Sequence, residues 1–351
     1  MTARTAPLSA RVLPEPTGHV PPWPGRQEGP VFVRRGPAGE EPALLVHGLG
    51  GSSTNWTDLI ALLEGVLECE ALDLPGFGHS PPPARGYALR THVQAVVDRI
   101  EARGAGAVHL MGNSLGGAVA VQVAAARPDL VRTLTLVSPA LPTLLPPRGA
   151  DPRLPLLVLP GVRRLATRRM AALTPQQRAR AVLDLCFGDP SRISPERYRE
   201  AADEVARRGA LGYDTDAFNG SLRGLAATYA HRGPRAVWRQ VRRVQAPSLV
   251  VWGVRDRLVP VRLAARTAEA LPDGRLLVLS GVGHVAQMER PDLVARAVLP
   301  LILGEAEGHE QHDTRADLQT SPRADVHEPP DSGGTLAQPA PHPGPGRHTG
   351  G

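Results

Sequence analysis

One serine lies in a sequence pattern that could make it a nucleophile. Residues 112–117 read Gly-Asn-Ser-Leu-Gly-Gly, which places Ser114 in a G-x-S-x-G pattern between an apolar run typical of a buried strand and a small-residue run typical of a helix. At such a sharp turn, glycines avoid clashes with neighbouring backbone and the serine Oγ projects outward. We therefore predict that Ser114 attacks a carbonyl group. The amide of Leu115, at the helix N-terminus, is predicted to face the developing negative charge.

Two residues far along the chain could assist this nucleophile. Asp256 follows an apolar run at 248–254, and His284 follows a run at 276–279 and two glycines. An imidazole, whose unperturbed pKa is about 6.5, can act as general base and general acid near neutral pH. A carboxylate beside it orients the ring and stabilises its protonated form. We therefore predict that His284 takes the serine proton and that Asp256 is its partner.

A glycine-rich loop could donate a second amide to the same charge. Residues 47–51 read His-Gly-Leu-Gly-Gly and follow an apolar run at 43–46. Glycine lets the backbone approach a reacting oxygen closely. We predict the amide of Leu49 as this second donor and His47 as a residue that shapes the loop. The residues predicted to line the substrate pocket are Asn113, Trp56, Val285 and Met288. For Trp56 the alternative of core packing stays open.

The elements that must hold these residues alternate along the chain. Short runs rich in Val and Leu, typical of strands buried on both faces, are followed by helical patterns. This alternation predicts an α/β fold with a doubly wound, mostly parallel, eight-stranded sheet. The runs that predict strands lie at 31–34, 43–46, 70–74, 107–111, 131–137, 248–254 and 276–279. The patterns that predict helices lie at 87–103, 115–126, 261–270 and 291–303.

One stretch interrupts this alternation and has the character of an inserted helical unit. Residues 141–246, here called the insertion, contain helix signals and no clear strand. Thr174-Pro175-Gln176-Gln177 has the form of a capping box with proline at the first helical position, and Ser194-Pro195-Glu196 predicts a second helix start. We predict that the insertion separates two parts of one α/β core, at 31–140 and 247–304.

Both ends of the chain differ in composition from this core. Residues 1–30 are rich in proline and are predicted to form a poorly ordered leader. In residues 305–351 apolar side chains almost vanish, so burial cannot offset the entropy cost of ordering, and we predict a disordered tail. The leader lacks the apolar centre of a secretory signal, and no apolar stretch is long enough for a transmembrane helix. Because two cysteines also suit a reducing compartment, we expect a cytoplasmic protein.

Charge is distributed unevenly along the chain. The formal net charge is +6, and all 40 basic residues are arginine. The insertion holds 19 arginines against 9 acidic residues, whereas the rest of the chain holds 21 against 25. We interpret this surplus as solvated arginine-rich helices and favour that over contact with an anionic membrane surface or an acidic substrate. With aromatic residues at 3% and no basic–aromatic pattern, nucleic acid is not an expected partner.

These motifs together resemble those of the α/β-hydrolase fold family. The segments that carry the resemblance are HGLGGSSTNW (47–56), DLPGFGHS (73–80), GNSLGG (112–117), VWGVRDRLVP (251–260) and GVGHVAQMERP (281–291). The resemblance implies Ser114 as nucleophile, His284 as base and Asp256 as the residue that orients it. It also implies that the amides of Leu49 and Leu115 form an oxyanion hole and that the insertion is a cap over the pocket. No metal and no organic cofactor are implied.

The residue at the nucleophile position narrows the chemistry. Related dehalogenases and epoxide hydrolases have aspartate there, whereas this chain has Ser114, which favours an acyl-enzyme route. We predict hydrolysis of a small-molecule carboxylic ester with a small or medium apolar acyl group. One alternative is a C–C bond hydrolase of the meta-cleavage-product type, which Asn113 and residues 283–290 resemble, although Gly51 and Val285 depart from its pattern. The other is a non-catalytic ligand-binding receptor on the same fold. The sequence leaves the oligomeric state open.

Overall fold

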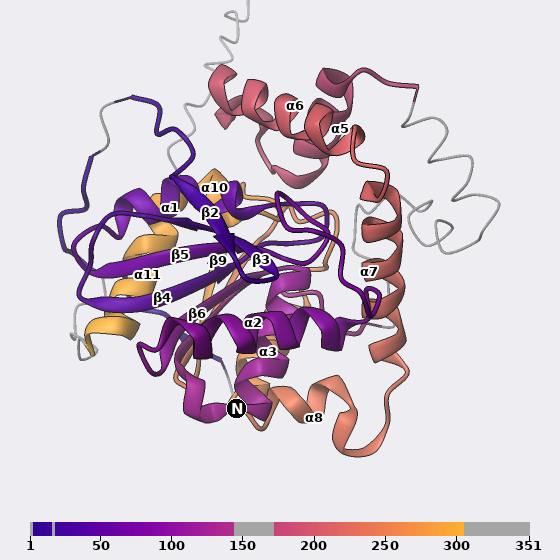
Figure 1. The fold of residues 1–351 in the computed structure, drawn as a ribbon. Helices are drawn as coiled ribbons and strands as arrows, with labels where there is room; N and C mark the ends of the chain where they lie inside the picture. Colours follow the sequence, from indigo (N-terminus) through magenta and orange to yellow (C-terminus); the bar gives the residue numbers. More distant parts are fainter. Residues whose placement is uncertain (1–2, 16–17, 144–171, 305–351) are drawn as a thin grey trace, which may run out of the picture. The chain divides into compact units, whose positions relative to one another are not determined.

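A sheet of nine strands forms the centre of the protein (Figure 1). The computed structural model describes residues 3–15, 18–143 and 172–304. The strand order across the sheet is β1-β9-β8-β7-β6-β4-β5-β3-β2. The strands are β1 (Arg4–Thr5), β2 (Gly25–Glu28), β3 (Val31–Arg35), β4 (Glu41–Val46), β5 (Leu67–Asp73), β6 (Val108–Asn113), β7 (Val131–Val137), β8 (Ser248–Gly253) and β9 (Gly274–Leu279). The central strands are buried on both faces, which explains their near-continuous runs of Val and Leu.

Most neighbouring strands run parallel, and the exceptions lie at one edge. There β3 pairs antiparallel with both β2 and β5. Further in, β4 pairs with β5 on one side and with β6 on the other, so the chain proceeds outward from β4 in two directions. In such sheets ligands bind in the crevice outside the carboxyl ends of the strands, at the position where the strand order changes direction. The loops that leave β4, β6, β8 and β9 carry the residues predicted to do chemistry.

Helices cover both faces of the sheet. Because successive strand residues point to opposite faces, Leu44 and Val46 of β4 join the buried cluster under one helix layer, and Ala43 and Leu45 join the cluster under the other. The first layer consists of α2 (Leu89–Arg103), α3 (Leu115–Ala126), α8 (Val237–Val241) and α9 (Leu263–Ala270). The second consists of α1 (Thr57–Leu62), α10 (Ala286–Glu289) and α11 (Pro291–Leu303). Short 3-10 turns are η1 (Ser53–Trp56), η2 (Pro128–Leu130), η4 (Pro190–Arg192) and η5 (Gly233–Arg235).

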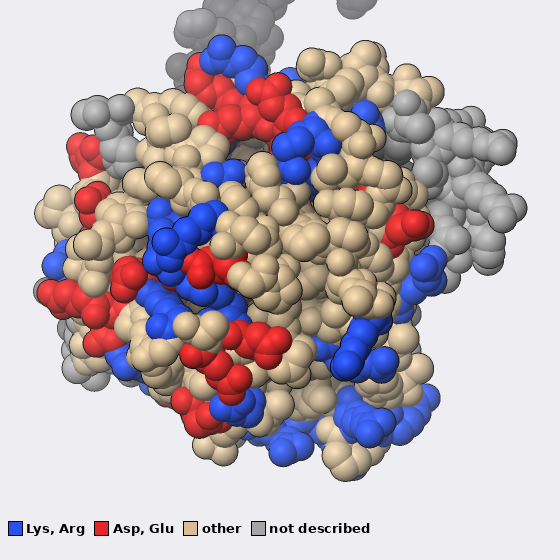
Figure 2. All heavy atoms as spheres, in the orientation of Figure 1, with Lys and Arg blue, Asp and Glu red and all other residues tan. Residues whose placement is uncertain are grey.

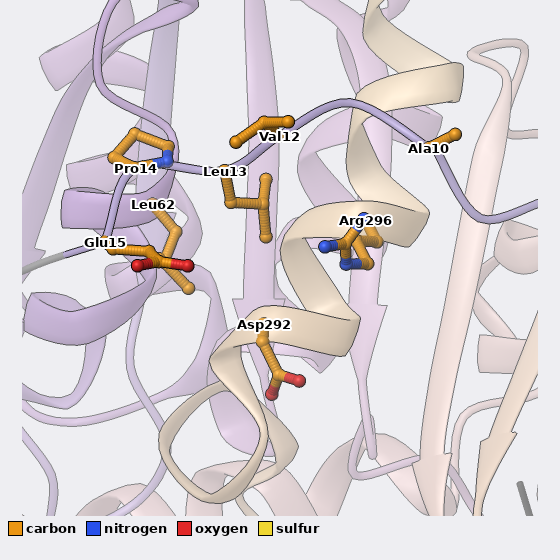
Figure 3. Close-up of a pocket in the computed structure, with 8 residues that line it drawn as sticks. All are labelled: Ala10, Val12, Leu13, Pro14, Glu15, Leu62, Asp292 and Arg296. Carbon is orange, nitrogen blue, oxygen red and sulfur yellow. The ribbon is translucent and has the colours of Figure 1, made fainter.

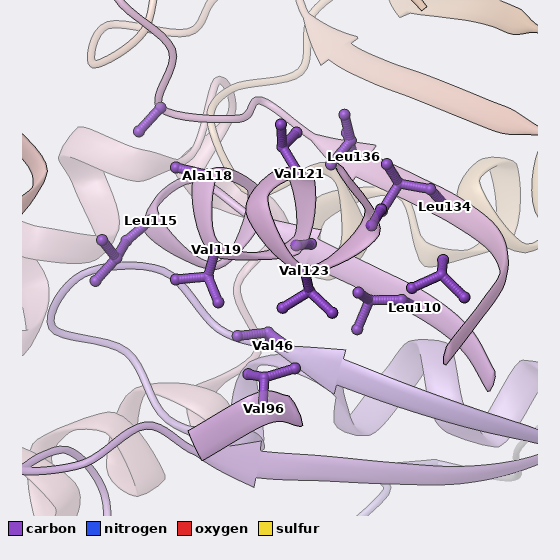
Figure 4. Close-up of a cluster of buried hydrophobic side chains, with 14 of the residues drawn as sticks. Val46, Val96, Leu110, Leu115, Ala118, Val119, Val121, Val123, Leu134 and Leu136 are labelled. Atoms are coloured by element: carbon purple, nitrogen blue, oxygen red, sulfur yellow. The ribbon is translucent and has the colours of Figure 1, made fainter. Parts of the chain in front are cut away.

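The small residues of α3 let this helix lie close against the sheet. A Cβ at Gly116 would overlap the carbonyl oxygen of Val46, so the approach of helix to strand requires glycine. Val119 and Val123 of α3 are fully buried in one cluster with Leu110 of β6 (Figure 4). Burial of each such side chain contributes about 1.5–3 kcal/mol. This packing fixes the start of α3, and with it the turn that precedes the helix.

The described part of the insertion consists of helices and their connections. It contains α5 (Pro175–Cys186), α6 (Pro195–Gly209), α7 (Asp214–Tyr229) and α8. The capping box predicted at the start of α5 is confirmed, because the Gln177 amide donates to Thr174 Oγ1 and the Thr174 amide donates to Gln177 Oε1. At the predicted start of α6, Ser194 Oγ accepts the amide of Arg197. α5 packs on α6, α7 on α2, and α8 on α3. Residues 144–171 of the insertion lie outside the described residues.

The N-terminal segment differs from the sequence-based expectation. Residues 1–30 are predicted to be poorly ordered, but the structure places β1 and β2 there, at opposite edges of the sheet. With these strands the sheet has nine members instead of the eight predicted. Backbone pairing needs no apolar run, so composition gave no sign of either strand. The predicted disordered tail, 305–351, lies outside the described residues. Of the helices that the structure describes, none is long and apolar enough to cross a membrane.

Candidate active site

Ser114 lies at the turn between β6 and α3 in a backbone conformation that side chains rarely adopt. Its φ is 53° and its ψ is −113°. Its amide donates to the carbonyl oxygen of Val137 at 3.0 Å. The turn is tight, since a Cβ at Gly112 would lie 2.5 Å from the carbonyl oxygen of Gly116. Such strain costs about 1–3 kcal/mol and persists only where the surrounding structure holds it. The turn therefore keeps Ser114, half-buried, at the carboxyl edge of the sheet.

His284 and Asp256 form a buried pair. His284 Nδ1 lies 2.8 Å from Asp256 Oδ2, and the two side chains are 5% and 0% exposed. The other carboxylate oxygen accepts the amides of Leu258 and Val259 at 2.8 and 2.9 Å. These bonds hold the carboxylate in place. Because a carboxylate only accepts hydrogen bonds, Nδ1 is the ring nitrogen that donates to it. Nε2 is then the nitrogen that can accept a proton from another group.

Asn113, next to the serine, ties the histidine loop to the sheet. This residue is predicted to line the pocket, but it is 3% exposed. Its Nδ2 donates to the carbonyl oxygens of His284 and Val137, both at 3.1 Å. The last residue of β6 thus holds the loop after β9 beside the turn that carries Ser114. Asn113 thus supports the site through its Nδ2, and its place in a pocket wall stays a prediction.

The loop predicted to supply the second amide lies against the serine. A Cβ at Gly48 would lie 3.1 Å from Ser114 Cβ and 2.9 Å from Asn113 Oδ1. Leu49 follows this contact directly. Leu115 is the first residue of α3, so its amide has no acceptor within the helix. Leu115 thus adjoins Ser114 in sequence, and Leu49 adjoins the glycine that packs against Ser114.

His47 holds this loop in place as a neutral ring. Its Nε2 accepts the amide of Leu74 at 2.9 Å, so Nδ1 must be the protonated nitrogen that donates to the carbonyl oxygen of Gly48 at 2.7 Å. The side chain is fully buried, and burial lowers the pKa of His47, which keeps the ring neutral. Its contacts are those of a residue that shapes the loop, as the sequence predicts.

The structure places the other three predicted pocket residues in packed surroundings. Trp56 is 0% exposed in the cluster under α1 and α11, which is the core-packing alternative. Val285 and the half-buried Met288 pack with Leu183 and Phe187 of the insertion. Val285 is 8% exposed. For Trp56 this packing fits the core-packing alternative. Val285 is more exposed than His284, so its place in the pocket stays a prediction.

The loop that carries His284 is joined to the insertion by contacts that the sequence does not reveal. The His284 amide donates to the carbonyl oxygen of Cys186, at the end of α5, at 2.7 Å. Beside this contact Glu289 accepts the amides of Gly283 and Gly188 at 2.8 and 2.9 Å. Every residue except proline has a backbone amide, so the sequence does not indicate which amides a carboxylate will bind. These contacts could therefore not be predicted from a motif.

Neither cysteine is a further candidate for a nucleophile. Cys69 and Cys186 are both free, and burial raises the pKa of each thiol to about 12. For Cys186 the negative charge of Asp256 adds to this effect. Both thiols therefore stay protonated at neutral pH. Within the part of the chain that the structure describes, no three His, Cys, Asp or Glu side chains are grouped as a metal site requires.

A surface cavity of about 550 Å³ lies between the N-terminal segment, α1 and α11 (Figure 3). Its lining residues are Ala10, Val12, Leu13, Pro14, Glu15, Leu62, Asp292 and Arg296. None of them belongs to the loops that carry Ser114, Asp256 or His284. We therefore assign this cavity no part in the chemistry.

The sequence is similar to those of known enzymes over most of its length. Residues 42–291 match the model of a family described as alpha/beta hydrolase fold. The chain is 30% identical, over 74% of its length, to the dihydrolipoyllysine-residue acetyltransferase component of the acetoin cleaving system of Cupriavidus necator. It spans 62% of that protein, less than two thirds.

This chain covers larger shares of a second relative and of a solved structure. The chain is 27% identical to a 2-hydroxy-6-oxononadienedioate/2-hydroxy-6-oxononatrienedioate hydrolase of a Pseudomonas species, over 78% of this chain and 92% of the relative. Among solved structures, a membrane phospholipase A described as a bacterial virulence factor has a TM-score of 0.62 and 25% identity. The match covers 78% of this chain and 82% of that one.

Proposed function

Because this chain belongs to the α/β-hydrolase fold family, we propose that it is a serine hydrolase of carboxylic esters. The proposed substrate is a small molecule with a small or medium apolar acyl group, and the proposed route is an acyl-enzyme on Ser114. The observation that carries the proposal is the buried His284–Asp256 pair, 2.8 Å apart, because its histidine lies in a loop tied through Asn113 to the strained serine turn.

The first half-reaction would form the acyl-enzyme. Ser114 Oγ attacks the ester carbonyl carbon while His284 Nε2 takes its proton. The carbonyl oxygen becomes an oxyanion, and the proposed donors to it are the amides of Leu49 and Leu115. Asp256 stabilises the imidazolium without becoming protonated. His284 then gives the proton to the leaving alcohol as the C–O bond breaks.

The second half-reaction would release the acid. His284 takes a proton from water, and the hydroxide adds to the acyl carbon. When the new oxyanion collapses, Ser114 leaves and recovers the proton from His284. We propose that the insertion acts as a cap, which limits access of water and substrate to this sequence of steps.

A C–C bond hydrolase is the second candidate. It is favoured by the similarity to the 2-hydroxy-6-oxononadienedioate/2-hydroxy-6-oxononatrienedioate hydrolase, which covers most of both chains. The similarity to a phospholipase A instead favours an ester. Both reactions would use the same serine and histidine, so only substrates can separate the two candidates.

The experiment that tests the proposal labels the full chain with a fluorescent fluorophosphonate, with Ser114→Ala as the control. The same preparations are assayed with p-nitrophenyl esters of increasing chain length and with a 2-hydroxy-6-oxo-dienoate. We expect labelling that is lost in the variant, and ester turnover that is highest for short or medium chains.

Two other outcomes would change the proposal. Labelling with turnover of the dienoate and not of the esters would establish the C–C alternative. Well-folded protein that is neither labelled nor active would refute the serine mechanism and leave a ligand-binding receptor as the remaining interpretation.

A further inference from the structure

Glu289 is a buried carboxylate with no part in the proposed reaction. It is the last residue of α10 and is 5% exposed. Its Oε2 accepts the amides of Gly283 and Gly188 at 2.8 and 2.9 Å, and its Oε1 accepts the amide of Asp189 at 2.8 Å. Among the described residues it has no cationic partner within ion-pair distance. Three backbone amides therefore stabilise a charge whose burial would otherwise be costly.

These amides belong to two segments that are distant in sequence and pack backbone to backbone. Gly188 and Asp189 follow α5 in the insertion, whereas Gly283 immediately precedes His284. A Cβ at Gly283 would overlap the carbonyl oxygen of Cys186, and one at Gly188 would lie 2.5 Å from the carbonyl oxygen of Gly281. Glycine at these positions allows the two segments to approach each other, and Glu289 accepts hydrogen bonds from both segments.

Other contacts join the same two regions. The His284 amide donates to the Cys186 carbonyl oxygen at 2.7 Å. From the loop that carries Asp256, Arg255 Nη1 donates to the carbonyl oxygen of Gly188 at 3.1 Å. The two segments thus meet where the base and its carboxylate partner are held. In this group of contacts Glu289 is the one side chain whose acceptors serve both segments.

We propose that Glu289 is a positioning residue for His284, which it holds by coupling the histidine loop to the end of α5. This inference rests on the proposed function, in which the imidazole must lie where it can take the Ser114 proton. A carboxylate suits the position because both of its oxygens accept hydrogen bonds. Glutamine would instead turn an NH₂ group toward at least one backbone amide, so two donors would face each other.

The test compares Glu289→Gln with a matched variant of another buried carboxylate, Glu70→Gln. Glu70 on β5 is 1% exposed and bonded by Arg99, and it touches neither segment. Amide hydrogen exchange is measured by mass spectrometry over residues 183–192 and 280–290 in the full chain. The rate of fluorophosphonate labelling is measured on the same samples, per folded molecule.

We expect Glu289→Gln to accelerate exchange in both segments together, and Glu70→Gln to leave them unchanged. We also expect labelling to slow at least tenfold, because misplacement of a reacting group by about 1 Å can cost about 100-fold. In ester turnover the loss should fall on kcat and leave KM nearly unchanged, since Glu289 touches no substrate.

Three results would overturn the inference. Exchange that stays slow, or that rises in one segment alone, would refute the coupling. Faster exchange in both segments with labelling at the wild-type rate would reduce Glu289 to a purely structural role. Equal slowing of labelling by Glu70→Gln would show a general effect of instability. Wild-type protein that does not label would count against the proposed function, whereas the exchange comparison would still decide the coupling.

Discussion

Asn113 and Gly48 bring three separate loops together around Ser114. Asn113 binds the carbonyl oxygen of His284, and Gly48 lets the loop after β4 approach both Asn113 and Ser114. Neither residue has a reactive group. Their contribution is to hold backbone, and each can be tested separately from the residues proposed to react.

Replacement of Asn113 by alanine should separate support from pocket lining. The change leaves the carbonyl oxygen of His284 without the donor that Asn113 supplies, whereas that of Val137 keeps the Ser114 amide. We therefore expect a loss of about 1–3 kcal/mol in the free energy of unfolding, measured with urea. We also expect kcat to fall with little change in KM. Gln94→Ala, which removes an exposed amide, is the control. A rise in KM at unchanged kcat would place Asn113 in the pocket wall.

Replacement of Gly48 by alanine should displace the loop that carries Leu49. The added methyl group would meet Asn113 Oδ1 at 2.9 Å, and that side chain is held by two hydrogen bonds, so the loop must move instead. We expect labelling of Ser114 to slow at least about tenfold, with a stability loss of about 1–3 kcal/mol. Gly212→Ala, where a Cβ meets nothing within 4 Å, should be neutral. Unchanged labelling would argue against Leu49 as an oxyanion donor.

The sequence identifies reactive residues better than supporting ones. The pairing of Asp256 with His284 and the turn at Ser114 could be predicted because each residue lies at a recognisable break after a strand, whereas their roles in a reaction stay predictions. For Trp56 the sequence leaves pocket lining and core packing open, and burial favours core packing. Glu289 could not be assigned at all, since its partners are backbone amides.

At the level of elements, periodicity predicted the core closely. The strand expected at 131–137 and the helices expected at 115–126 and 291–303 coincide with β7, α3 and α11. Apolar runs and flanking Gly or Pro define such boundaries locally. How the insertion docks on the core has no local signal. One point of contact is His92 of α2, whose Nε2 lies 2.9 Å from Ser221 Oγ of α7.

From the burial of His92 at this contact we expect the protein to lose stability in acid. His92 is fully buried, and burial, with a smaller effect of His47, lowers its pKa to about 4. Below pH about 6.5 the unfolded chain takes up a proton at His92 that the folded chain does not bind. The contribution of His92 to the free energy of unfolding is therefore fully present above pH about 6.5. It falls by up to about 3 kcal/mol as the pH drops toward 4.

Urea unfolding of wild type and His92→Gln at pH 7.5 and pH 4.5 checks this expectation. The variant has no imidazole to titrate, so its free energy of unfolding should fall less between the two pH values. His109, whose pKa burial also lowers to about 4, remains in both proteins. Equal losses in the two proteins would rule out His92 as a source of the acid sensitivity.

Within the insertion, some arginines are paired with acidic residues and others are not. Arginines of α5 and α6 pair with nearby acids, as in Arg180–Asp184 and Arg207–Glu204. Five exposed arginines at 232–243, around η5 and α8, have no ion-pair partner among the described residues. Figure 2 shows basic side chains at the lower right, near the place of α8 in Figure 1. They are Arg232, Arg235, Arg239, Arg242 and Arg243. The sequence-based interpretation of such arginines as a solvated face, favoured over contact with an anionic membrane surface, stays a prediction.

The N-terminal segment spans the molecule from one sheet edge to the other. Trp23 Nε1 donates to the Thr57 carbonyl oxygen of α1, and Arg197 of α6 donates to the carbonyl oxygen of Val20. Deletion of residues 1–30 should therefore lower the free energy of unfolding by at least about 2 kcal/mol and promote aggregation through the exposed edges of β3 and β9. Thermal unfolding and light scattering provide the measurements.

Deletion of 305–351 is the control for this experiment. The sequence predicts that this segment is disordered, so its removal should leave the unfolding temperature unchanged. A chain that lacks residues 1–30 and is as stable and monodisperse as the full chain would restore the leader to the poorly ordered segment that its composition suggests.

The parallel pairing of β1 with β9 has a consequence for biosynthesis. Arg4 aligns with Arg275, so β1 leaves the ribosome long before the strand that pairs with it. At about 5–20 residues per second, β1 waits tens of seconds for a partner that does not yet exist. During that interval β8 is also missing, and the nascent sheet ends at β7 with an unpaired edge. Chaperones that shield such edges during translation would therefore protect this chain most in the period before β8 and β9 emerge.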